Sequence, residues 1–563
     1  MNCTRRTALT AALGTGLINL SSPVFAKKRS DDLKPEKITD VIVVGFGGAG
    51  ATTAITAADA GAKVLVLERQ PKATLRSNTR LSAGIFHCPG KDGNADALAE
   101  YATAMFAGPN GSTVSAGEHD DISAELGKGF AQYATGLVDF MKKCDPSFNP
   151  LPLPGWGASS LYPRGSETAY AMVRASYTKR VVSPSKSTYN LPKEQTCGGE
   201  AFWHCLETGV ESRADKIEVA YEMRAIRLTQ DTAGAVTGVI AVDSSGNEHY
   251  FRARRGVVLC SGGYEFHPGM RKAFLPGQGG EGWAFYGTPY NEGDGIAMGL
   301  SAGAGMHRAS SVAGAVIMAS PIRHNGLRIG MMTSTTSSGH SIIVNNFGRR
   351  YASEYKTQNG AGENSFHVLS SALNVDTLAY DASPSWLIFD ETLRLQKPIV
   401  NLGSASVGYG FVDWGAKDNS TAIQKGWILK GDTIEELAQK IAETKDNAGR
   451  MRPETLRATV DAFNAACARG KDDEFGRSKE TLTPVAKAPY YAVLLCSGGP
   501  NTKGGLAANG KKEVLDWNDK PIPRLYAVGE ISCGLEQGGA MLTDLLVFGQ
   551  IAGKEVANLK PLT

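Results

Sequence analysis

The stretch VIVVGFGGAG, residues 41–50, followed by VLVLE at residues 64–68, determines the fold class of this chain. An apolar run short enough for a buried strand leads into a glycine turn, and a second apolar run ends in an acid. Gly45 permits a tight turn, Gly47 lets backbone N–H groups approach a pyrophosphate, and Gly50 lets the next helix lie close to the sheet. Strand, turn, helix, strand and acid fall in order within about thirty residues, which predicts a dinucleotide-binding α/β unit.

The residues that follow the glycines fit the same unit. Small residues at 51–60 predict its helix, and Gly61 is placed to end it. The helix N-terminus would face the phosphates with its partial positive charge. Glu68 can accept hydrogen bonds from the two hydroxyl groups of a ribose. A G-x-G-x-x-G sequence alone also fits an ordinary turn beside a buried strand, so the prediction depends on the complete ordered unit.

Length and composition restrict the class of protein. A chain of 563 residues is too long for one compact core, so two or more domains are expected. Hydrophobic residues at 42% and charged residues at 20% are typical of a globular protein. The net charge is +3 and no long basic block occurs, which gives no reason to expect nucleic acid as a partner.

The first 26 residues have the pattern of an export signal. Arg5 and Arg6 precede an apolar stretch at residues 8–20, and small residues end the segment at Ala26. The paired arginines resemble a twin-arginine signal, and cleavage is expected between Ala26 and Lys27. The apolar run is short for a membrane span of roughly twenty residues, although an uncleaved anchor is the alternative. We expect a periplasmic or otherwise exported protein with no stable membrane span after cleavage.

The cysteines suggest neither a disulfide framework nor a metal or haem site. Of the nine cysteines, Cys3 lies in the predicted signal, and the others form no C-x-x-C pair, so small buried apolar residues are the default interpretation. No C-x-x-C-H motif for covalent c-type haem occurs. We predict no metal site, and we expect any electron acceptor or donor to be a separate molecule.

Changes in residue composition and hydrophobic pattern along the chain predict a cofactor domain in two segments. From residue 309 the sequence is rich in Ser, Thr and Asn, and it contains amphipathic helical patterns at 432–443 and 454–466. An apolar run ending in Gly-Glu returns at 523–530. The predicted organisation is an export signal at 1–26, a linker at 27–37, a first part of the cofactor domain at 38–308, an inserted domain at 309–489, and a second part of the cofactor domain at 490–563.

Seven blocks in sequence order resemble one flavoprotein superfamily: 45–50, 257–263 (VVLCSGG), 293–295 (GDG), 342–354 (IIVNNFGRRYASE), 502–506 (TKGGL), 525–530 (LYAVGE) and 544–553 (DLLVFGQIAG). The superfamily contains the flavoprotein subunits of fumarate reductase and succinate dehydrogenase, urocanate reductase and 3-ketosteroid dehydrogenases. The resemblance runs from about residue 39 to the C-terminus. It implies a Rossmann-like FAD-binding domain in two segments with an inserted α+β capping domain. It also implies hydride exchange between flavin N5 and a substrate carbon.

The physical argument also favours FAD over NAD, because a nicotinamide cofactor must come and go, whereas two distant segments here close over one ligand. The resemblance places residues 77–79 and 83–84 beside the flavin ring and Glu530 at the ribityl chain. A helix starting near residues 542–543 would aim N–H groups at the N1/O2 edge, which gains negative charge on reduction. The predicted cofactor-binding residues are Gly45, Gly47, Gly48, Gly50, Glu68, Arg69, Ser77, Asn78, Thr79, Ala83, Gly84, Ser261, Gly262, Asp294, Gly529, Glu530, Leu542 and Thr543.

The resemblance further implies that FAD is held without a covalent bond. In succinate dehydrogenase subunits a histidine in an R-S-H-T sequence bonds to the flavin. This chain reads Arg-Ser-Asn-Thr at residues 76–79, and the amide of Asn78 cannot form that bond.

The residues that hold a dicarboxylate in fumarate reductases are replaced in this chain. Counting from the matching blocks, Gln358 stands in the place of the proton-donating arginine, Asn501 in that of a substrate histidine, and Glu536 in that of a second arginine. At ~4 Å and an effective dielectric near 20, an acid in place of that arginine turns roughly 4 kcal/mol of attraction into repulsion. Fumarate and succinate are therefore poor candidate substrates.

The tyrosine pair of the steroid 1-dehydrogenases is absent as well. The corresponding places are Gln358 and Leu535, although Tyr355 lies three residues before Gln358 and could supply a phenol. Oxidation of a C–C bond needs a base and a group that polarises the activating carbonyl. The candidate catalytic residues are Tyr355, Gln358, Asn501 and Glu536, with Glu536 either the base or the partner of a cationic or hydroxyl-bearing substrate. A polar wall residue without a proton-transfer role is the alternative for each.

Three functions remain open at this point. The first is an exported FAD dehydrogenase for a CH–CH bond in a carbonyl-activated hydrophobic compound, 3-ketosteroid-like or aromatic, with a separate acceptor such as a cytochrome or quinone. The second is a periplasmic ene-reductase of an α,β-unsaturated compound other than fumarate. The third is a flavin-binding carrier or assembly factor without turnover, for which a lid that excludes water would bring little advantage.

Overall fold

The computed structural model describes residues 34–107, 120–155, 157–159, 162–182, 195–278, 280–312, 315–333, 338–354, 369–403, 405–532 and 540–562. The predicted export signal and three candidate catalytic residues, Tyr355, Gln358 and Glu536, lie outside these ranges. In the part of the chain that is described, no helix is both long and apolar enough to cross a membrane.

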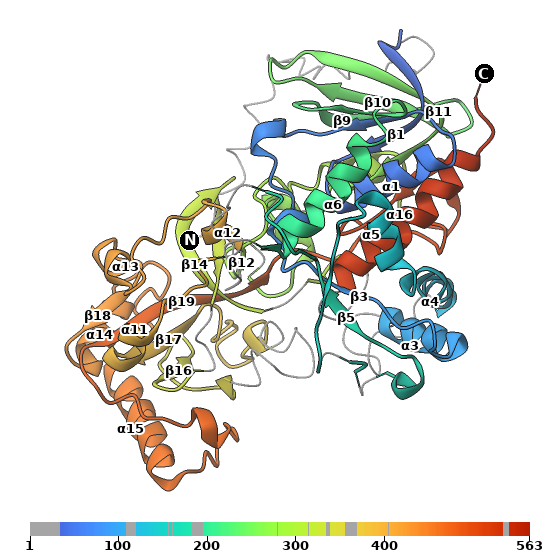
Figure 1. Ribbon diagram of the computed structural model, residues 1–563. Helices are drawn as coiled ribbons and strands as arrows, with labels where there is room; N and C mark the ends of the chain where they lie inside the picture. The colour runs from blue at the N-terminus through green and yellow to red at the C-terminus, as the bar shows by residue number, and fades with distance from the viewer. Residues whose placement is uncertain are drawn as a thin grey trace, which may run out of the picture.

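An eight-stranded sheet carries the predicted dinucleotide unit (Figure 1). Its main path runs β21-β22-β11-β1-β2-β8, and β10 and β9 extend from β11 by antiparallel pairing. β1 pairs in parallel with β2 and β11, and β22 from the C-terminal part pairs in parallel with β11. The bounds are β1 Lys37–Val44, β2 Val64–Leu67, β8 Ile217–Ala220, β9 Arg224–Gln230, β10 Val236–Val242, β11 Glu248–Leu259, β21 Glu513–Leu515 and β22 Pro521–Ala527.

The turn after β1 explains why the sequence needs glycines there. Gly45 has a φ of +99°, and its N–H donates to the carbonyl oxygen of Leu67 at 2.8 Å. A Cβ on Gly50 would lie 2.0 Å from the carbonyl oxygen of Gly45, so only glycine lets α1 (Gly48–Asp59) approach the turn. The helix begins at Gly48, earlier than the predicted residue 51.

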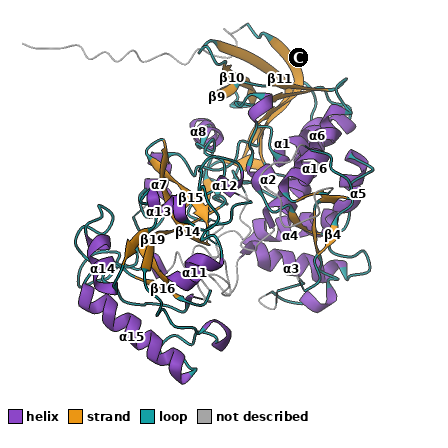
Figure 2. Ribbon diagram, turned by 60° about the vertical axis from the view of Figure 1, so that its left-hand side comes forward, coloured by secondary structure: helices purple, strands orange, loops and turns teal. Residues whose placement is uncertain are grey.

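Helices cover the face of this sheet on which α1 lies. α16 packs along α1, where a Cβ on Gly553 would lie 2.6 Å from the carbonyl oxygen of Thr53. Figure 2 shows these helices gathered on one side of the molecule. They are α3 Ala95–Ala107, α4 Asp120–Ala134, α5 Leu137–Cys144, α6 Gly199–Glu211 and α16 Ala540–Asn558. Small sheets beside them contain β3 Ile85–His87, β4 Leu151–Pro152, β5 Met172–Arg174, β6 Ser176–Tyr177 and β7 Thr196–Cys197.

A seven-stranded sheet forms the second body, in the order β12-β15-β14-β19-β17-β16, with β18 paired to β19. The two predicted amphipathic helices correspond to α14 and α15, which lie at the far end of the molecule (Figures 1 and 2). The bounds are β12 Trp283–Phe285, β14 Ala315–His324, β15 Leu327–Met332, β16 Ser341–Val344, β17 Ser385–Asp390, β18 Leu429–Gly431, β19 Tyr490–Gly499, α14 Ile434–Ala442 and α15 Pro453–Arg469.

Two strands of this second sheet lie beyond the predicted domain boundaries at residues 309 and 490. β12 precedes the first boundary, and β19 follows the second, yet β19 pairs with β12, β14, β17 and β18. The sheet therefore includes strands from both flanking segments. The residue composition along the chain does not reveal this, because paired strands can be far apart in sequence. The remaining elements are α2 Asn78–Leu81, α7 Pro268–Phe274, α8 Asp294–Ser301, α11 Glu391–Gln396, α12 Ala405–Gly408, α13 Ser420–Gln424, β13 Met306–His307 and β20 Gly505–Leu506.

Candidate cofactor and substrate site

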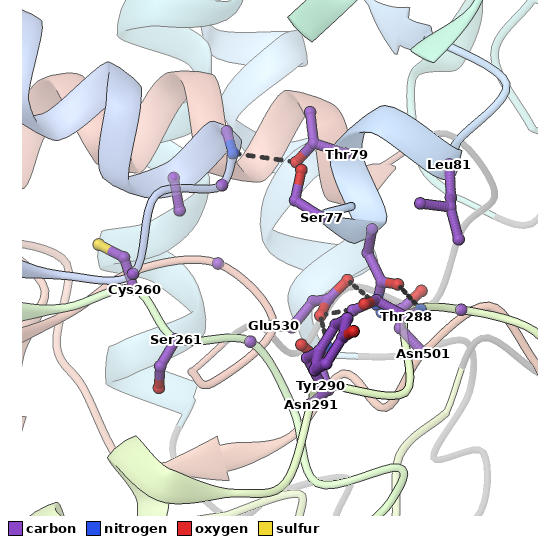
Figure 3. A pocket seen from close by; sticks show the side chains of 18 of the residues that line it. Ser77, Thr79, Leu81, Cys260, Ser261, Thr288, Tyr290, Asn291, Asn501 and Glu530 are labelled. Atoms are coloured by element: carbon purple, nitrogen blue, oxygen red, sulfur yellow. Dashed lines mark hydrogen bonds between the residues drawn. The ribbon is translucent and has the colours of Figure 1, made fainter. Parts of the chain in front are cut away.

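A cavity of about 440 Å³ is lined by residues at the ends of β1, β2 and β11 of the eight-stranded sheet and by Met332 of β15 in the seven-stranded sheet. Figure 3 shows some of its lining side chains. Both sequence segments of the predicted cofactor domain contribute to its wall. The predicted residues that line it are Gly45, Gly47, Gly48, Glu68, Arg69, Ser77, Asn78, Thr79, Ala83, Ser261, Gly262, Asp294, Gly529, Glu530 and Leu542.

Three predicted cofactor residues lie behind this wall instead of in it. Gly50 packs under Gly45, and a Cβ on Gly84 would lie 2.3 Å from the backbone of Gly198. The hydroxyl oxygen of Thr543 accepts a hydrogen bond from the N–H of His87 at 2.7 Å. These residues support the backbone of the cavity wall. A sequence motif does not distinguish this supporting role from direct contact with a cofactor.

The glycine turn leaves space at the start of α1. A Cβ on Gly47 would meet Ser77 Cβ at 3.7 Å and Thr79 Oγ1 at 3.9 Å, so protein atoms do not fill this position tightly. The N–H of Gly48 donates to Thr79 Oγ1 at 3.0 Å, as the dashed line to Thr79 in Figure 3 shows. One N–H of the helix N-terminus is thus satisfied by the loop, while Gly47 remains open toward the cavity.

Glu68 is held by two backbone N–H groups. Its Oε2 accepts from Phe46 and its Oε1 from Gln70, both at 2.8 Å. Burial of the side chain raises the pKa of Glu68 above its usual value, against the effect of these hydrogen bonds. Each carboxylate oxygen can accept further bonds, so the fixed group can receive the two hydroxyl protons of a ribose.

A charged cluster begins at Arg69, next to Glu68, and four of its five members line the cavity. Arg69 Nη1 donates to Glu292 Oε2 at 2.8 Å, and Arg224 Nη2 donates to Asp294 Oδ1 at 2.6 Å. His324 Nε2 lies 2.8 Å from Glu292 Oε1. Burial opposes the charge of Glu292, but hydrogen bonds with His324 and Arg69 lower its pKa to about 2. The motif analysis included Arg69 and Asp294 but missed the other three, whose partners are far apart in sequence.

Asn78 and Glu530 join the two sequence segments at another part of the wall. Asn78 Nδ2 donates to Glu530 Oε1 at 3.0 Å and to Oε2 at 3.1 Å, and Asn291 Nδ2 donates to Oε2 at 2.8 Å (Figure 3). Asn78 Oδ1 accepts from the N–H of Thr288 at 2.6 Å. Burial raises the pKa of Glu530 to about 7. These hydrogen bonds orient the Glu530 carboxyl group in the cavity wall without a positively charged side chain as partner.

Residues of the second body and of the loop after β19 also line the cavity. Met332 of β15 and Ala405 of α12 line it together with Asn501 and Lys503, two buried residues of the loop after β19. The Asn501 side chain donates to the carbonyl oxygen of Thr502 at 2.7 Å. Of the four candidate catalytic residues, only Asn501 lies within the described ranges, and it is in the cavity wall. The sequence places Lys503 within the TKGGL block, but the burial of its side chain cannot be read from the sequence.

The wall has the chemistry that a dinucleotide cofactor needs. Ser261 Oγ and Thr288 Oγ1 are buried in residues that line the cavity, and neither has a hydrogen-bond partner within the described part of the chain. Buried polar atoms normally have a partner, and the hydroxyl, phosphate and ring groups of FAD could supply one. The open position at Gly47 and the acceptors of Glu68 fit the same ligand.

Known proteins provide independent comparisons. The model of the FAD binding domain family matches residues 40–542. The 4-oxocyclohexanecarboxylate 2-dehydrogenase of Sinomonas cyclohexanicum is 26% identical and aligns over 93% of this chain and 94% of that protein. A probable fumarate reductase of Shewanella frigidimarina (strain NCIMB 400) is 26% identical over 93% of this chain and 76% of that protein.

A solved structure shares the fold. The 3-ketosteroid delta1-dehydrogenase from Sterolibacterium denitrificans superposes with a TM-score of 0.71 over 92% of this chain and 99% of that chain, at 22% identity. The resemblance to fumarate reductases and 3-ketosteroid dehydrogenases inferred from the seven sequence blocks is confirmed. The mixed α/β fold is that of FAD-binding flavoenzymes.

Proposed function

This chain belongs to the FAD binding domain family and is an FAD-dependent oxidoreductase of CH–CH groups, and we propose that it dehydrogenates a carbonyl-activated hydrophobic compound. The proposed substrate is a ring ketone, 3-ketosteroid-like or aromatic. The reaction removes a proton and a hydride from adjacent carbons.

The pairing of the arginines in the cavity wall carries this proposal. The arginines among the described lining residues are Arg69 and Arg224, and both are bound to the carboxylates of Glu292 and Asp294. Their charges are therefore already balanced and unsuited to gripping a dicarboxylate. Asn501, an uncharged amide, occupies the place of the fumarate-reductase histidine. The relative that acts on 4-oxocyclohexanecarboxylate, by its name a ring ketone, supports the same substrate class.

The residues of the cavity have distinct proposed roles toward the cofactor. When bound, FAD supplies a two-electron acceptor for hydride. Glu68 holds the adenosine ribose, the N-terminus of α1 faces the phosphates, and Glu530, oriented by Asn78, contacts the ribityl chain. The first residues of the 19-residue helix α16, which include Leu542, direct its N-terminal dipole toward the flavin. Because Asn78 has an amide where covalent relatives have histidine, the cofactor is bound without a covalent bond.

The proposed chemistry at the substrate needs two groups from this chain. Asn501 donates from its amide to the activating carbonyl oxygen, and Glu536 removes the proton. Tyr355 and Gln358 complete the polar wall. The body around the seven-stranded sheet acts as the cap that excludes water. The proposed domain division follows the one inferred from the sequence, except that β12 and β19 are moved to the cap.

The proposal also includes export of this protein and electron transfer to a separate redox partner. Residues 1–26 direct twin-arginine export to the periplasm, where a cytochrome or quinone receives the electrons. The alternative is an ene-reductase of an α,β-unsaturated compound, which the 26% identity to a probable fumarate reductase favours. Flavin chemistry is reversible, so the direction depends on the partner.

An anaerobic screen of steroids, phenylpropanoids and unsaturated acids tests the proposal. The oxidised protein should lose its flavin absorbance with a saturated ring ketone, and Glu536→Gln should slow this bleaching by about 10²–10⁴-fold, as expected for loss of a general base. Unchanged bleaching of Glu536→Gln at every pH would show that Glu536 is only a wall residue. Faster reoxidation of the reduced protein by an unsaturated acid than reduction by any ketone would favour the ene-reductase.

A further inference from the structure

A second carboxyl group lies behind Glu530 and takes no part in the proposed chemistry. Glu265 follows the glycine-rich end of β11 and precedes α7, and its side chain is completely buried. Unlike Glu530, it does not line the cavity. Gly263 lies between the two acids. Its N–H faces Glu530, and a Cβ built on it would come within 2.7 Å of Glu265 Oε1.

The two oxygens of Glu265 have different surroundings. Oε1 accepts from the N–H of Thr502 at 2.6 Å and from the Thr502 hydroxyl at 3.2 Å. Oε2 is buried and has no hydrogen-bond partner within the described residues. A carboxylate divides its charge over both oxygens, and a buried oxygen without a donor makes the charged form costly.

Glu530 is surrounded by donors on both oxygens. It receives two contacts from Asn78 and one from Asn291. Asn291 also lowers the pKa of Glu265, but the hydrogen bonds of Glu265 at 3.2 Å or less come from Thr502 and reach one oxygen only. Two buried carboxyl groups this close do not both ionise readily, and the group with more donors keeps the charge. The unequal donor sets therefore assign the charge to Glu530 and the proton to Glu265.

The cations around Glu265 do not neutralise it. Arg271 of α7 points its guanidinium at backbone carbonyl oxygens, including that of Glu265 at 3.3 Å, instead of at the carboxyl group. The Tyr264 hydroxyl donates to the carbonyl oxygen of Ala309, and Lys503, next to Thr502, lines the cavity. Burial first, and the charge of Glu530 second, raise the pKa of Glu265 to about 8.

We propose that Glu265 is a neutral carboxylic acid at pH 7 and is a positioning residue, which lets Glu530 alone present a negative charge to the ribityl side of FAD. The inference rests on the proposed placement of Glu530 against the cofactor. When Glu265 loses its proton to bulk water at alkaline pH, the second charge repels Glu530 across Gly263 and Asn291. The wall of the cavity then loses its geometry and FAD binds less tightly.

Dilution of the FAD-loaded protein, with released flavin followed by fluorescence from pH 6 to 9.5, tests this inference. Wild type should lose at least threefold in FAD affinity between pH 7 and 9.5. Glu265→Gln imitates the neutral acid, so it should match wild type within twofold at pH 7 and show no alkaline loss. Glu443→Gln, which removes an exposed carboxyl directly after α14, should retain the wild-type pH profile.

Three outcomes would overturn the inference: more than fivefold weaker binding of Glu265→Gln at pH 7, an alkaline loss that persists in this variant, or a flat wild-type profile. If the variant does not fold, infrared spectra of the wild-type loaded protein decide. A protonated-carboxyl band should lose its last intensity with a midpoint near pH 8, above the value of about 7 for Glu530, and complete loss of the band by pH 7.5 contradicts the inference. Neither readout involves a substrate, so an incorrect substrate class would leave both results interpretable.

Discussion

The side-chain amide of Asn78 donates to both carboxyl oxygens of Glu530, at 3.0 and 3.1 Å, and so connects residues 452 positions apart. The same amide accepts from the N–H of Thr288 through its oxygen. Three segments of the cavity wall therefore meet at one side chain. By the sequence resemblance, Asn78 corresponds to the histidine that bonds to flavin in covalent relatives, and in this structure it is a polar link within the wall.

Replacing Asn78 with alanine should weaken FAD binding by about 10- to 150-fold, because a hydrogen bond to a charged group contributes about 1.5–3 kcal/mol. The measurement is the dissociation constant from flavin fluorescence. Asn464→Ala removes two hydrogen bonds with Val485 in the second body and should leave FAD affinity unchanged. Equal affinity of Asn78→Ala and wild type would show that the link does not shape the site.

Two glycine substitutions in the fingerprint should have opposite effects. Gly47→Ala adds a methyl group where the nearest protein atom is at 3.7 Å, and the backbone φ of −95° suits alanine. It should retain wild-type stability but lose about tenfold or more in FAD affinity, or about 1.4 kcal/mol. Gly50→Ala places a Cβ 2.0 Å from Gly45 O and should destabilise the protein by about 1–3 kcal/mol or more. Urea unfolding and FAD titration of both variants separate the effects, and the reverse pattern would contradict the assignment.

Removing Glu292 should loosen the contact between the two bodies. Its carboxylate binds Arg69 and Arg224 beside the eight-stranded sheet and His324 at the end of β14. Glu292→Ala should lower the free energy of unfolding by about 1–3 kcal/mol. Glu211→Ala, which breaks an exposed pair with Lys72, should cost no more than about 1 kcal/mol. Similar losses in both variants would mean that the cluster does not join the bodies.

Stability should fall as pH rises from the acid range because both buried acids release their protons at a higher pH in the native state than in the unfolded chain, Glu530 before Glu265. Burial raises the pKa of Glu265 to about 8 and that of Glu530 to about 7, from 4.5. Above pH 4.5 the unfolded chain releases protons that the native state keeps, so the free energy of unfolding declines by up to about 1.4 kcal/mol per pH unit for each group. Glu265→Gln should reduce this slope between pH 5 and 8, whereas Glu443→Gln should not. Identical slopes for the two variants would refute the assignment.

Local chemistry made the dinucleotide unit predictable from sequence. Gly45 needs positive φ and Gly50 needs close packing, and both requirements are encoded by the residue type alone. The contacts of Glu292 with His324 and of Asn78 with Glu530 arise only when remote segments pack together. Long-range packing also explains why β12 and β19 belong to the second sheet, although the sequence around each of them resembles that of the cofactor domain. Of the candidate catalytic residues, the structure places Asn501 in the cavity, and the roles of Tyr355, Gln358 and Glu536 stay predictions.

The most direct test of the central claim is the absorbance of bound flavin on anaerobic mixing with 4-oxocyclohexanecarboxylate and with a saturated 3-ketosteroid. The account predicts that at least one of these ring ketones bleaches the flavin band and yields one equivalent of its unsaturated product per FAD. A flavin that stays oxidised with both ketones, in a protein with full FAD content, would contradict the proposed ring-ketone dehydrogenase.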